Sequence, residues 1–249
     1  MKAMKPYRQF LKDTIRKKMD FRLTDQNQGV PAPPVERPCP EGAVRLDLPG
    51  PDDWSGIEPC DLSRAIRDRR SRRRYRDLPL TLDELAWLLW STQGITGPVS
   101  HGHALRTVPS AGCRHAFETY LAIFRVNGIE PGLYRYLPLS HQLVLEFTDD
   151  LLAPKIITAS FGQAYPGRAA VTFVWSCIPY RMEWRYGAAA HKVIALDAGH
   201  VCQNLYLACE AVACGTCAIA AYDQEEMDDL LGLDGQDEFT IYLAPVGKV

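Results

Sequence analysis

The first sixty residues differ from the rest of the chain in how their apolar positions are arranged. Up to about residue 27, apolar side chains recur mostly three to four positions apart, which predicts a polar amphipathic helix over residues 1–27. Residues 31–59 hold eight of the eighteen prolines, and such a stretch has extended backbone with few internal hydrogen bonds. We therefore expect an N-terminal helix and proline-rich arm over residues 1–59, and a folded domain over residues 60–249. The apolar positions of the helix are Phe10, Leu11, Ile15, Met19 and Phe21.

The pattern becomes regular beyond residue 60. Apolar positions at 62, 65 and 66 predict a short helix. Thr81 is followed three residues later by Glu84, which is a capping box and predicts the start of a second helix. Gly94 is placed to end that helix.

A long helix is predicted over residues 193–214, with Gly215 as its C-terminal cap. Glu210 is its only ionised side chain beyond residue 197, apart from a charge that His200 can acquire. A helix that is apolar on most sides is buried in a large core or against another subunit. This is the first indication of a dimer.

Short runs rich in β-branched and aromatic residues predict the strands. The run over residues 169–178 is almost continuously apolar, as in a strand covered on both faces. Because helices and strands mix without strict alternation, we predict an α+β fold with a central sheet covered by helices. The remaining expected strands cover residues 119–126, 133–136, 142–147 and 239–246.

The composition excludes some classes of protein. The chain has 249 residues and a formal net charge of −2, so it has no global attraction for nucleic acid or membrane surfaces. The N-terminus leads into a charged stretch without the apolar region of a signal peptide, and the longest apolar run, residues 169–178, is too short to span a bilayer. We expect a cytoplasmic protein, in which the eight cysteines stay reduced.

Eight arginines fall within thirteen residues, more than a solvated helix face requires. They can clamp a phosphate, because the guanidinium fork binds phosphate oxygens in pairs, and Ser71 within the run can add a hydroxyl. They can also bind nucleic acid, or simply pair with nearby aspartates. From the residues alone all three interpretations stay open. The arginines are Arg64, Arg67, Arg69, Arg70, Arg72, Arg73, Arg74 and Arg76.

Three further motifs are weak when each is taken alone. The small residues of Pro109-Ser110-Ala111-Gly112 let a backbone approach a flat ring closely. Arg185-Tyr186 can supply a proton donor beside a reacting group. Cys214-Gly215-Thr216-Cys217 is a CxxC motif, but it closes a predicted helix and has no second ligand pair, so we interpret it as structural.

Taken in order, these segments resemble the nitroreductase superfamily and, more narrowly, its SagB-type dehydrogenase branch, which includes azoline oxidases. The resemblance runs from about residue 62 to residue 249. It implies a mixed or antiparallel sheet flanked by helices, in an intertwined homodimer that holds FMN at its interface. The matching motifs are Arg69-Arg70-Ser71-Arg72-Arg73, Leu89-Trp90-Ser91-Thr92-Gln93-Gly94, Pro109-Ser110-Ala111-Gly112 with His115 and Glu118, Trp184-Arg185-Tyr186-Gly187, Asp197-Ala198-Gly199-His200, Gln203-Asn204-Leu205, and Gly215-Thr216-Cys217-Ala218-Ile219.

The resemblance also implies residue roles. Tyr186 would be the acid or base, with Arg185 orienting the substrate. Lys248 would join the arginines at the FMN phosphate, and NADH or NADPH is the candidate electron donor for a small-molecule substrate. The implied cofactor residues are Arg69, Arg70, Ser71, Arg72, Arg73 and Lys248 at the phosphate, Pro109, Ser110, Ala111, Gly112 and Cys113 along the isoalloxazine, and Ala218, Ile219, Ala220 and Ala221 near the ring's N5.

Two positions depart from the family pattern. Ala220 stands where the family often has glycine, which leaves less room over the ring. Arg185 stands where azoline oxidases carry lysine, and arginine stays protonated, which counts against azoline oxidation. The sequence therefore predicts an FMN-dependent oxidoreductase. The alternative is a catalytically silent flavin-fold protein whose basic segment binds RNA or an acidic partner, although nucleic acid is the less expected ligand.

Overall fold

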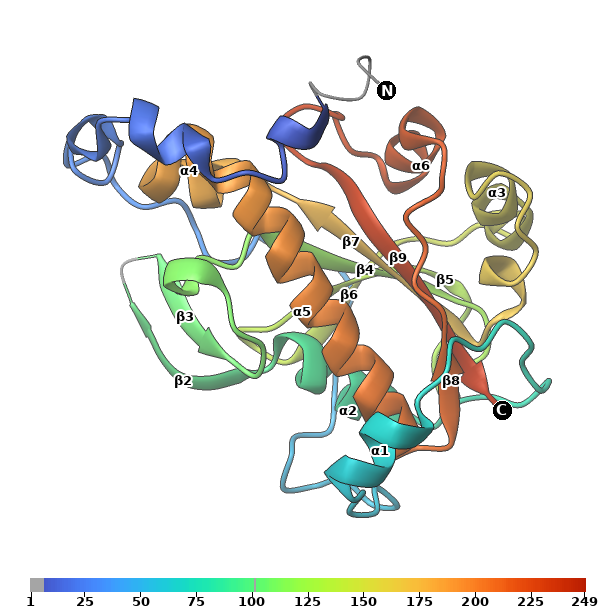
Figure 1. Ribbon diagram of the computed structural model, residues 1–249. Coiled ribbons are helices and arrows are strands. Elements are labelled where there is room, and N and C mark those ends of the chain that lie inside the picture. The colour runs from blue at the N-terminus through green and yellow to red at the C-terminus, as the bar shows by residue number, and fades with distance from the viewer. Residues whose placement is uncertain (1–6, 101) are drawn as a thin grey trace.

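The computed structural model describes residues 7–100 and 102–249, and its centre is a seven-stranded sheet (Figure 1). Every neighbouring pair of strands in this sheet is antiparallel. The order across the sheet is β1 (Arg45–Asp47), β6 (Gln142–Phe147), β5 (Gly132–Leu137), β4 (Phe117–Ile123), β7 (Val171–Cys177), β9 (Phe239–Lys248) and β8 (Cys214–Thr216).

Helices cover both faces of the sheet. On one face, α2 (Leu82–Gln93) and α5 (Ala190–Glu210) enclose the larger core, and on the other face α3 (Leu152–Ala159) and α6 (Gln224–Leu231) enclose a smaller one. Every residue of β4 and β7 is therefore buried, which explains the continuous apolar run in the sequence. The predicted α+β fold, a central sheet flanked by helices, is confirmed, and the sheet is antiparallel rather than mixed.

The second predicted helix forms as its sequence signals indicate. Thr81 Oγ1 accepts a hydrogen bond from the backbone N–H of Glu84, whose carboxylate accepts one from the N–H of Thr81. Gly94 is the C-terminal cap. Figure 1 shows α5 lying across the sheet, with α4 (Tyr180–Tyr186) at one end and α1 (Leu62–Asp68) at the other.

The prediction of a helix over residues 1–27 is wrong for the residues described, and residues 1–6 lie outside them. The segment forms only short 3-10 helices, Tyr7–Gln9, Thr14–Lys18 and Phe21–Leu23. Asp20 explains one of the breaks, because its carboxylate accepts a hydrogen bond from the N–H of Arg22 and so caps a separate turn. The arm over residues 31–59 contributes β1 to the sheet, and the boundary at residue 59 stays a prediction.

Gly215 does not cap the long helix, which ends at Glu210. Cys214–Thr216 instead forms β8 on the sheet edge. The reason for a glycine there is close packing, since a Cβ on Gly215 would lie 2.5 Å from a side-chain carbon of Arg72. Sequence patterns also missed α3, α4, α6 and a hairpin of β2 (Ile95–Ser100) and β3 (His103–Arg106). No helix of the described residues is long and apolar enough to cross a membrane.

Candidate functional site

The arginine-rich segment runs along the edge of the sheet, beside the end of the chain. The backbone N–H of Arg72 donates to the carbonyl of Thr216 at 2.8 Å, and that of Arg76 donates to the carbonyl of Lys248 at 2.8 Å. Ser71 forms an isolated bridge with Thr216. The two regions that the sequence assigns to a phosphate therefore adjoin each other in one chain.

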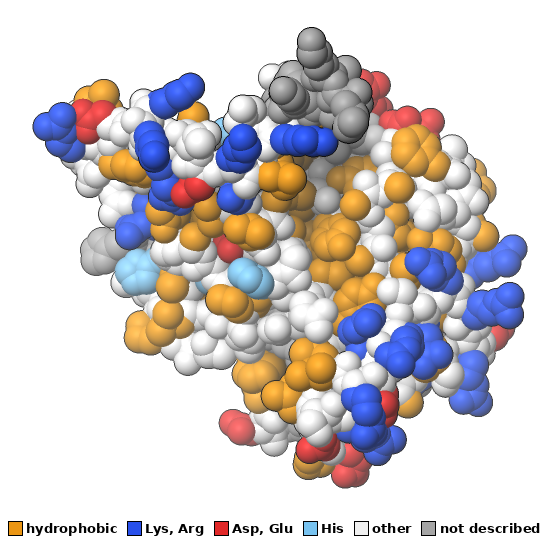
Figure 2. All heavy atoms as spheres, in the orientation of Figure 1, with side chains coloured by type: hydrophobic (Ala, Val, Ile, Leu, Met, Phe, Trp, Pro, Cys, Tyr) orange, Lys and Arg blue, Asp and Glu red, His pale blue; other side chains and the backbone are white. Residues whose placement is uncertain are grey.

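Most of the arginines have no carboxylate partner. Arg64 and Arg67 both pair with Asp68, while Asp77 pairs with Arg125 outside the cluster. Within residues 7–100 and 102–249 the other cluster members form no ion pair, so aspartate pairing does not account for them. Figure 2 shows basic side chains gathered over the end of α1 and the segment that follows it, and such a group of cations favours an anionic ligand. The members without an ion pair are Arg69, Arg70, Arg72, Arg73, Arg74 and Arg76.

Tyr206 of α5 connects this segment to residues 218–221. Its hydroxyl lies 3.0 Å from Ser71 Oγ and accepts a hydrogen bond from the N–H of Ala218 at 2.9 Å. The Arg69 guanidinium lies 5.3 Å from the centre of the Tyr206 ring, within cation–π distance. The sequence analysis did not identify Tyr206, because a helical pattern does not show which side chain contacts two other segments.

Residues 218–221 offer fewer free donors than the sequence suggests. The Ala218 N–H is used by Tyr206, and Ile219 exchanges backbone hydrogen bonds with Leu243 at 2.8 and 3.1 Å. Ala220 and Ala221 are exposed, and their N–H groups have no acceptor among the described residues. These two groups are therefore the donors available to a ligand at this edge.

The polar groups of the same edge suit a phosphate-bearing cofactor. The Thr216 hydroxyl is buried without a hydrogen-bond partner among the described residues, next to Ser71. Arg73 lies 5.9 Å from the Tyr165 ring, so a second guanidinium stands on an aromatic face. A phosphate would bind the unpaired guanidiniums and the unsatisfied hydroxyl. An attached heterocycle would accept hydrogen bonds from the two free backbone donors, so the residues present fit FMN.

The Lys248 ammonium does not point toward the arginines. Its Nζ binds the Glu84 carboxylate and donates to the carbonyl of Val212 at 2.9 Å. The side chain is 17% exposed. The structure thus brings the Lys248 backbone to the arginine segment but places its charge at the N-terminus of α2.

The loop after β3 and the Arg185-Tyr186 pair lie against each other. A Cβ on Gly112 would lie 2.7 Å from Tyr186 Oη and 2.8 Å from Arg185 Nε, so these side chains would have to shift if the residue were not glycine. Gly112 has a φ of +62°, which also favours glycine. The Ala111 N–H donates to Asp197 Oδ2 of α5 at 3.2 Å, and Ser110 Oγ accepts from the His115 N–H at 3.0 Å.

The two halves of the candidate site lie on opposite sides of α5. Asp197 holds the loop that contains Gly112, whereas Tyr206 holds the arginine segment. At 100° and 1.5 Å per residue, nine positions place these side chains about 180° apart around the helix and about 14 Å apart along it. One chain therefore does not bring the arginines and the Arg185-Tyr186 pair to a single face.

Within the CxxC motif, Cys214 lacks the features of a reactive cysteine. Cys214 and Cys217 are both buried and unbonded. Burial raises the pKa of the Cys214 thiol to about 12, which disfavours the reactive thiolate. Within the described residues no three His, Cys, Asp or Glu side chains are grouped as metal ligands.

The family follows from comparison with known proteins. The sequence profile of the Nitroreductase family matches residues 66–248, which is more than half of the chain. The chain belongs to the nitroreductase family. A relative from Methanocaldococcus jannaschii, named as a nitroreductase, is 30% identical over 192 residues, which cover 77% of this chain and 93% of the relative.

Further proteins and solved structures are also similar to this chain. The trifolitoxin-processing protein TfxB of Rhizobium leguminosarum is 26% identical over 140 residues, which cover 53% of this nitroreductase-family chain and 36% of TfxB. A crystal structure named as a nitroreductase of Ralstonia eutropha superposes with a TM-score of 0.67 and 28% identity, covering 88% of this chain and 98% of the other. The NADPH:FMN oxidoreductase of Vibrio harveyi shares the fold, with a TM-score of 0.53, 16% identity and coverage of 75% and 68%.

Proposed function

We propose that this protein is an FMN-dependent oxidoreductase that transfers hydride or electrons between a reductant and a small organic substrate. The observation that carries the proposal is that Tyr206 joins the segment of unpaired arginines to Ala218, through its contacts with Arg69, Ser71 and the Ala218 N–H. The free backbone donors of Ala220 and Ala221 follow closely after Ala218 in the chain. When bound, FMN supplies hydride and electron chemistry at N5. The FMN oxidoreductase among the proteins that share the fold supports this choice of cofactor.

The protein's part is to bind and orient. Arg69, Arg70, Ser71, Arg72 and Arg73 would hold the phosphate by charge-assisted hydrogen bonds. The ring would pass along residues 109–113 and end near residues 218–221. Among these, the N–H groups of Ala220 and Ala221 are the free donors. Lys248 stays a prediction as a phosphate ligand, because it would have to leave Glu84.

The working unit in this proposal is a homodimer with FMN at the interface. Its support is the placement of the two halves on opposite sides of α5, since a second copy can present residues 109–113 to the arginine segment of the first. On the outer face of α5, Leu196 is 55% exposed and is available to a partner.

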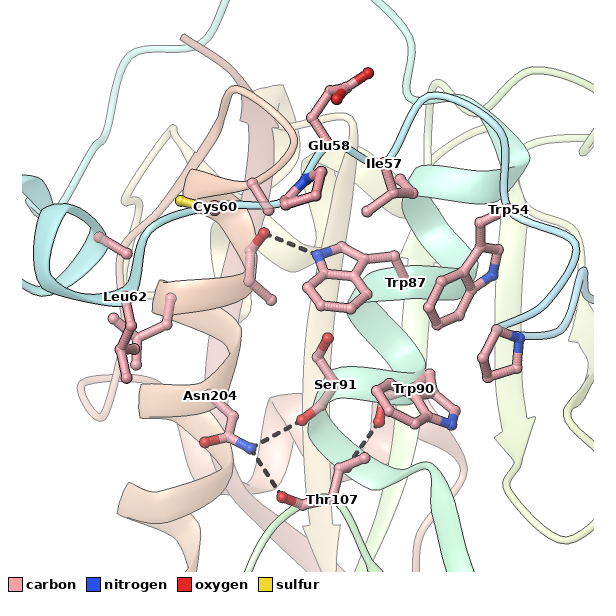
Figure 3. Close-up of a pocket in the computed structure, with 16 residues that line it drawn as sticks. Trp54, Ile57, Glu58, Cys60, Leu62, Trp87, Trp90, Ser91, Thr107 and Asn204 are labelled. Carbon is pink, nitrogen blue, oxygen red and sulfur yellow. Dashed lines mark hydrogen bonds between the residues drawn. The ribbon is translucent and has the colours of Figure 1, made fainter.

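A groove beside that face supports the same assembly. Trp54, Trp87 and Trp90 line a groove of about 640 Å³ between the proline-rich arm, α2 and α5 (Figure 3). The Asn204 amide closes its floor by donating to the carbonyls of Ser91 and Thr107. Tryptophans that are only partly buried, as these three are, are enriched at protein interfaces.

The catalytic pair in this proposal is Tyr186 with Arg185. Tyr186 Oη would donate or accept the substrate proton, and Arg185 would orient a carbonyl or an anionic group. NADH or NADPH is the proposed reductant. The similarity to TfxB supports a place in the SagB-type branch, although Arg185 makes azoline oxidation a poor fit. We assign the protein to the cytoplasm, where its eight unbonded cysteines would stay reduced.

The alternative, an RNA-binding protein without catalysis, has weaker support. Tyr75 is the aromatic residue within the arginine segment, and stacking on bases would need its ring. Its hydroxyl donates to backbone carbonyls of Arg72 and Pro245, and its ring packs on Gly247. The ring is therefore not free to stack.

The test is the absorption spectrum of the purified protein with and without added FMN. We expect yellow protein, and we expect Arg69→Ala with Ser71→Ala to weaken FMN binding at least tenfold, since charged hydrogen bonds are lost. Arg64→Ala is the control, because Arg64 pairs with Asp68. Colourless protein that fails to bind added FMN would refute the proposal, and so would generic RNA binding in its place.

A further inference from the structure

The segment from Arg16 to Asn27 is docked on α4, next to the proposed catalytic pair. The Gln26 N–H donates to the carbonyl of Trp184 at 2.9 Å, and Tyr180 Oη donates to Asp25 Oδ2 at 2.7 Å. A Cβ on Gly187 would lie 2.7 Å from the Met19 methyl carbon, so the chains touch there as well. These contacts come from residues far apart in sequence and fix the N-terminal segment over α4.

A shallow, open cavity of about 350 Å³ lies on the surface between this segment and α4. It adjoins Gly112, because Tyr186 Oη and Arg185 Nε, both from the cavity wall, lie against that glycine. The site therefore borders the loop proposed to run along the ring. Its lining residues are Arg16, Phe21, Gln26, Asn27, Arg185 and Tyr186.

The charged groups in this cavity are cations. Arg185 Nη1 donates to the neutral Gln26 amide at 3.0 Å, which orients its guanidinium without cancelling the charge. Arg16 pairs with Asp13, whose side chain is 51% exposed, so water screens that pair and it contributes little. No Asp or Glu is among the described residues that line the cavity.

A buried arginine behind the cavity adds to its positive potential. Arg114 is 3% exposed, and its Nη2 has no hydrogen-bond partner among the described residues. Its guanidinium lies 4.4 Å from the ring of Trp184, the residue before Arg185. Burial and then the charge of Arg185 lower the pKa of Arg114, as expected for two nearby cations.

The walls between the cations are aromatic. The Arg16 guanidinium lies 5.9 Å from the Phe21 ring and 6.0 Å from the Tyr186 ring, which positions its charge between two flat faces. Flat apolar walls suit a planar, unsaturated body, and guanidinium groups suit an oxyanion. A volume of about 350 Å³ is near the lower limit for small-molecule sites, which suits a small ligand such as benzoate.

We propose that this cavity is a carboxylate subsite, in which Arg16 and Arg185 hold the acid group of a planar, unsaturated substrate beside Tyr186. The inference rests on the proposed oxidoreductase function and names its substrate class. It also gives Arg185 a role that a permanently charged group can perform. The N-terminal segment thereby belongs to the substrate site.

The test is equilibrium binding by calorimetry, with benzoate and its neutral analogue benzamide as the probes. We expect benzoate to bind at least tenfold more tightly than benzamide, and Arg16→Gln to weaken benzoate binding about tenfold without changing benzamide binding. Arg22→Gln is the matched control, since its side chain is 88% exposed and pairs with Asp20. Phenyl phosphate distinguishes a carboxylate site from a general phosphate site.

Three results would overturn the subsite: equal binding of benzoate and benzamide, equal effects of Arg16→Gln and Arg22→Gln, or tighter binding of phenyl phosphate than of benzoate. The binding measurement needs no turnover, so it separates the two proposals. Yellow protein that reduces nitrobenzamide but has no benzoate preference would refute the subsite alone. Colourless protein that still prefers benzoate would refute the flavin proposal and leave the subsite supported.

Discussion

His115 provides a test of the buried cationic region that lies beside the loop after β3. The side chain is 4% exposed, and its Nε2 lies 2.9 Å from the carbonyl oxygen of Ala104. Burial, followed by the positive charge of Arg106, lowers the pKa of His115 to about 3. Because an unfolded histidine has a pKa of about 6.5, the unfolded chain binds a proton that the native protein excludes between these two values.

The sign and size of the effect follow from this difference. The unfolded state gains the proton as pH falls below about 6.5, so the free energy of unfolding decreases with falling pH down to about 3. With pKa values of about 3 and 6.5, the contribution lost between pH 7.5 and 4.5 is about 2.6 kcal/mol, and the limiting slope is about 1.4 kcal/mol per pH unit.

The assay is urea unfolding at pH 4.5, 5.5, 6.5 and 7.5 for the wild type and His115→Gln. Glutamine keeps an N–H donor for the Ala104 carbonyl but does not titrate. The free energy of unfolding of the variant should therefore fall less steeply toward low pH, by about 2 to 3 kcal/mol over the range. His200→Gln, at a side chain that is 53% exposed, is the control and should retain the wild-type profile. Identical pH profiles for the wild type and His115→Gln would refute the reasoning.

Three further variants test the site and the assembly. Tyr206→Phe removes the hydroxyl that joins Ser71 to the Ala218 N–H, so the FMN dissociation constant should rise about tenfold, with an unchanged circular dichroism spectrum; an unaltered dissociation constant would contradict this role for Tyr206. Leu196→Glu places a charge on the exposed face of α5. If that face binds a second copy, light scattering should show monomers of the variant. A variant that still forms dimers would show that the interface does not include this face. Cys217→Ser should keep its turnover per bound flavin, because the thiol is buried and forms no disulfide. A tenfold loss of turnover with full flavin occupancy would indicate a redox relay.

The sequence by itself determined those elements whose signals are local. Each of these signals lies within a few neighbouring residues, so each element was predicted from its own segment. They are the capping box of Thr81 and Glu84, the C-terminal cap at Gly94 and the apolar run of β7. The order of the motifs was sufficient to identify the family, which the match to residues 66–248 confirmed. The assigned roles of the arginines and of Tyr186 stay predictions.

Only the tertiary structure decided where charges and free donors lie. The sequence marked Lys248 as basic, but the Glu84 carboxylate that holds its ammonium is 164 positions away in the chain. Tyr206 connects two segments because folding brings Ser71 and Ala218 to its hydroxyl. Gly215 was misassigned as a cap, because the close approach of Arg72 is invisible to a local pattern.

The N-terminal segment shows the same limit most clearly. Its apolar spacing predicted a helix, yet its backbone bonds to α4 through Gln26 and Trp184, and Asp20 caps a separate turn. Helical spacing alone stabilises little in water, whereas packing on another element decides the conformation of a short segment. Local patterns thus specified the central strands and the helices α2 and α5, whereas long-range packing placed this segment over Arg185 and Tyr186.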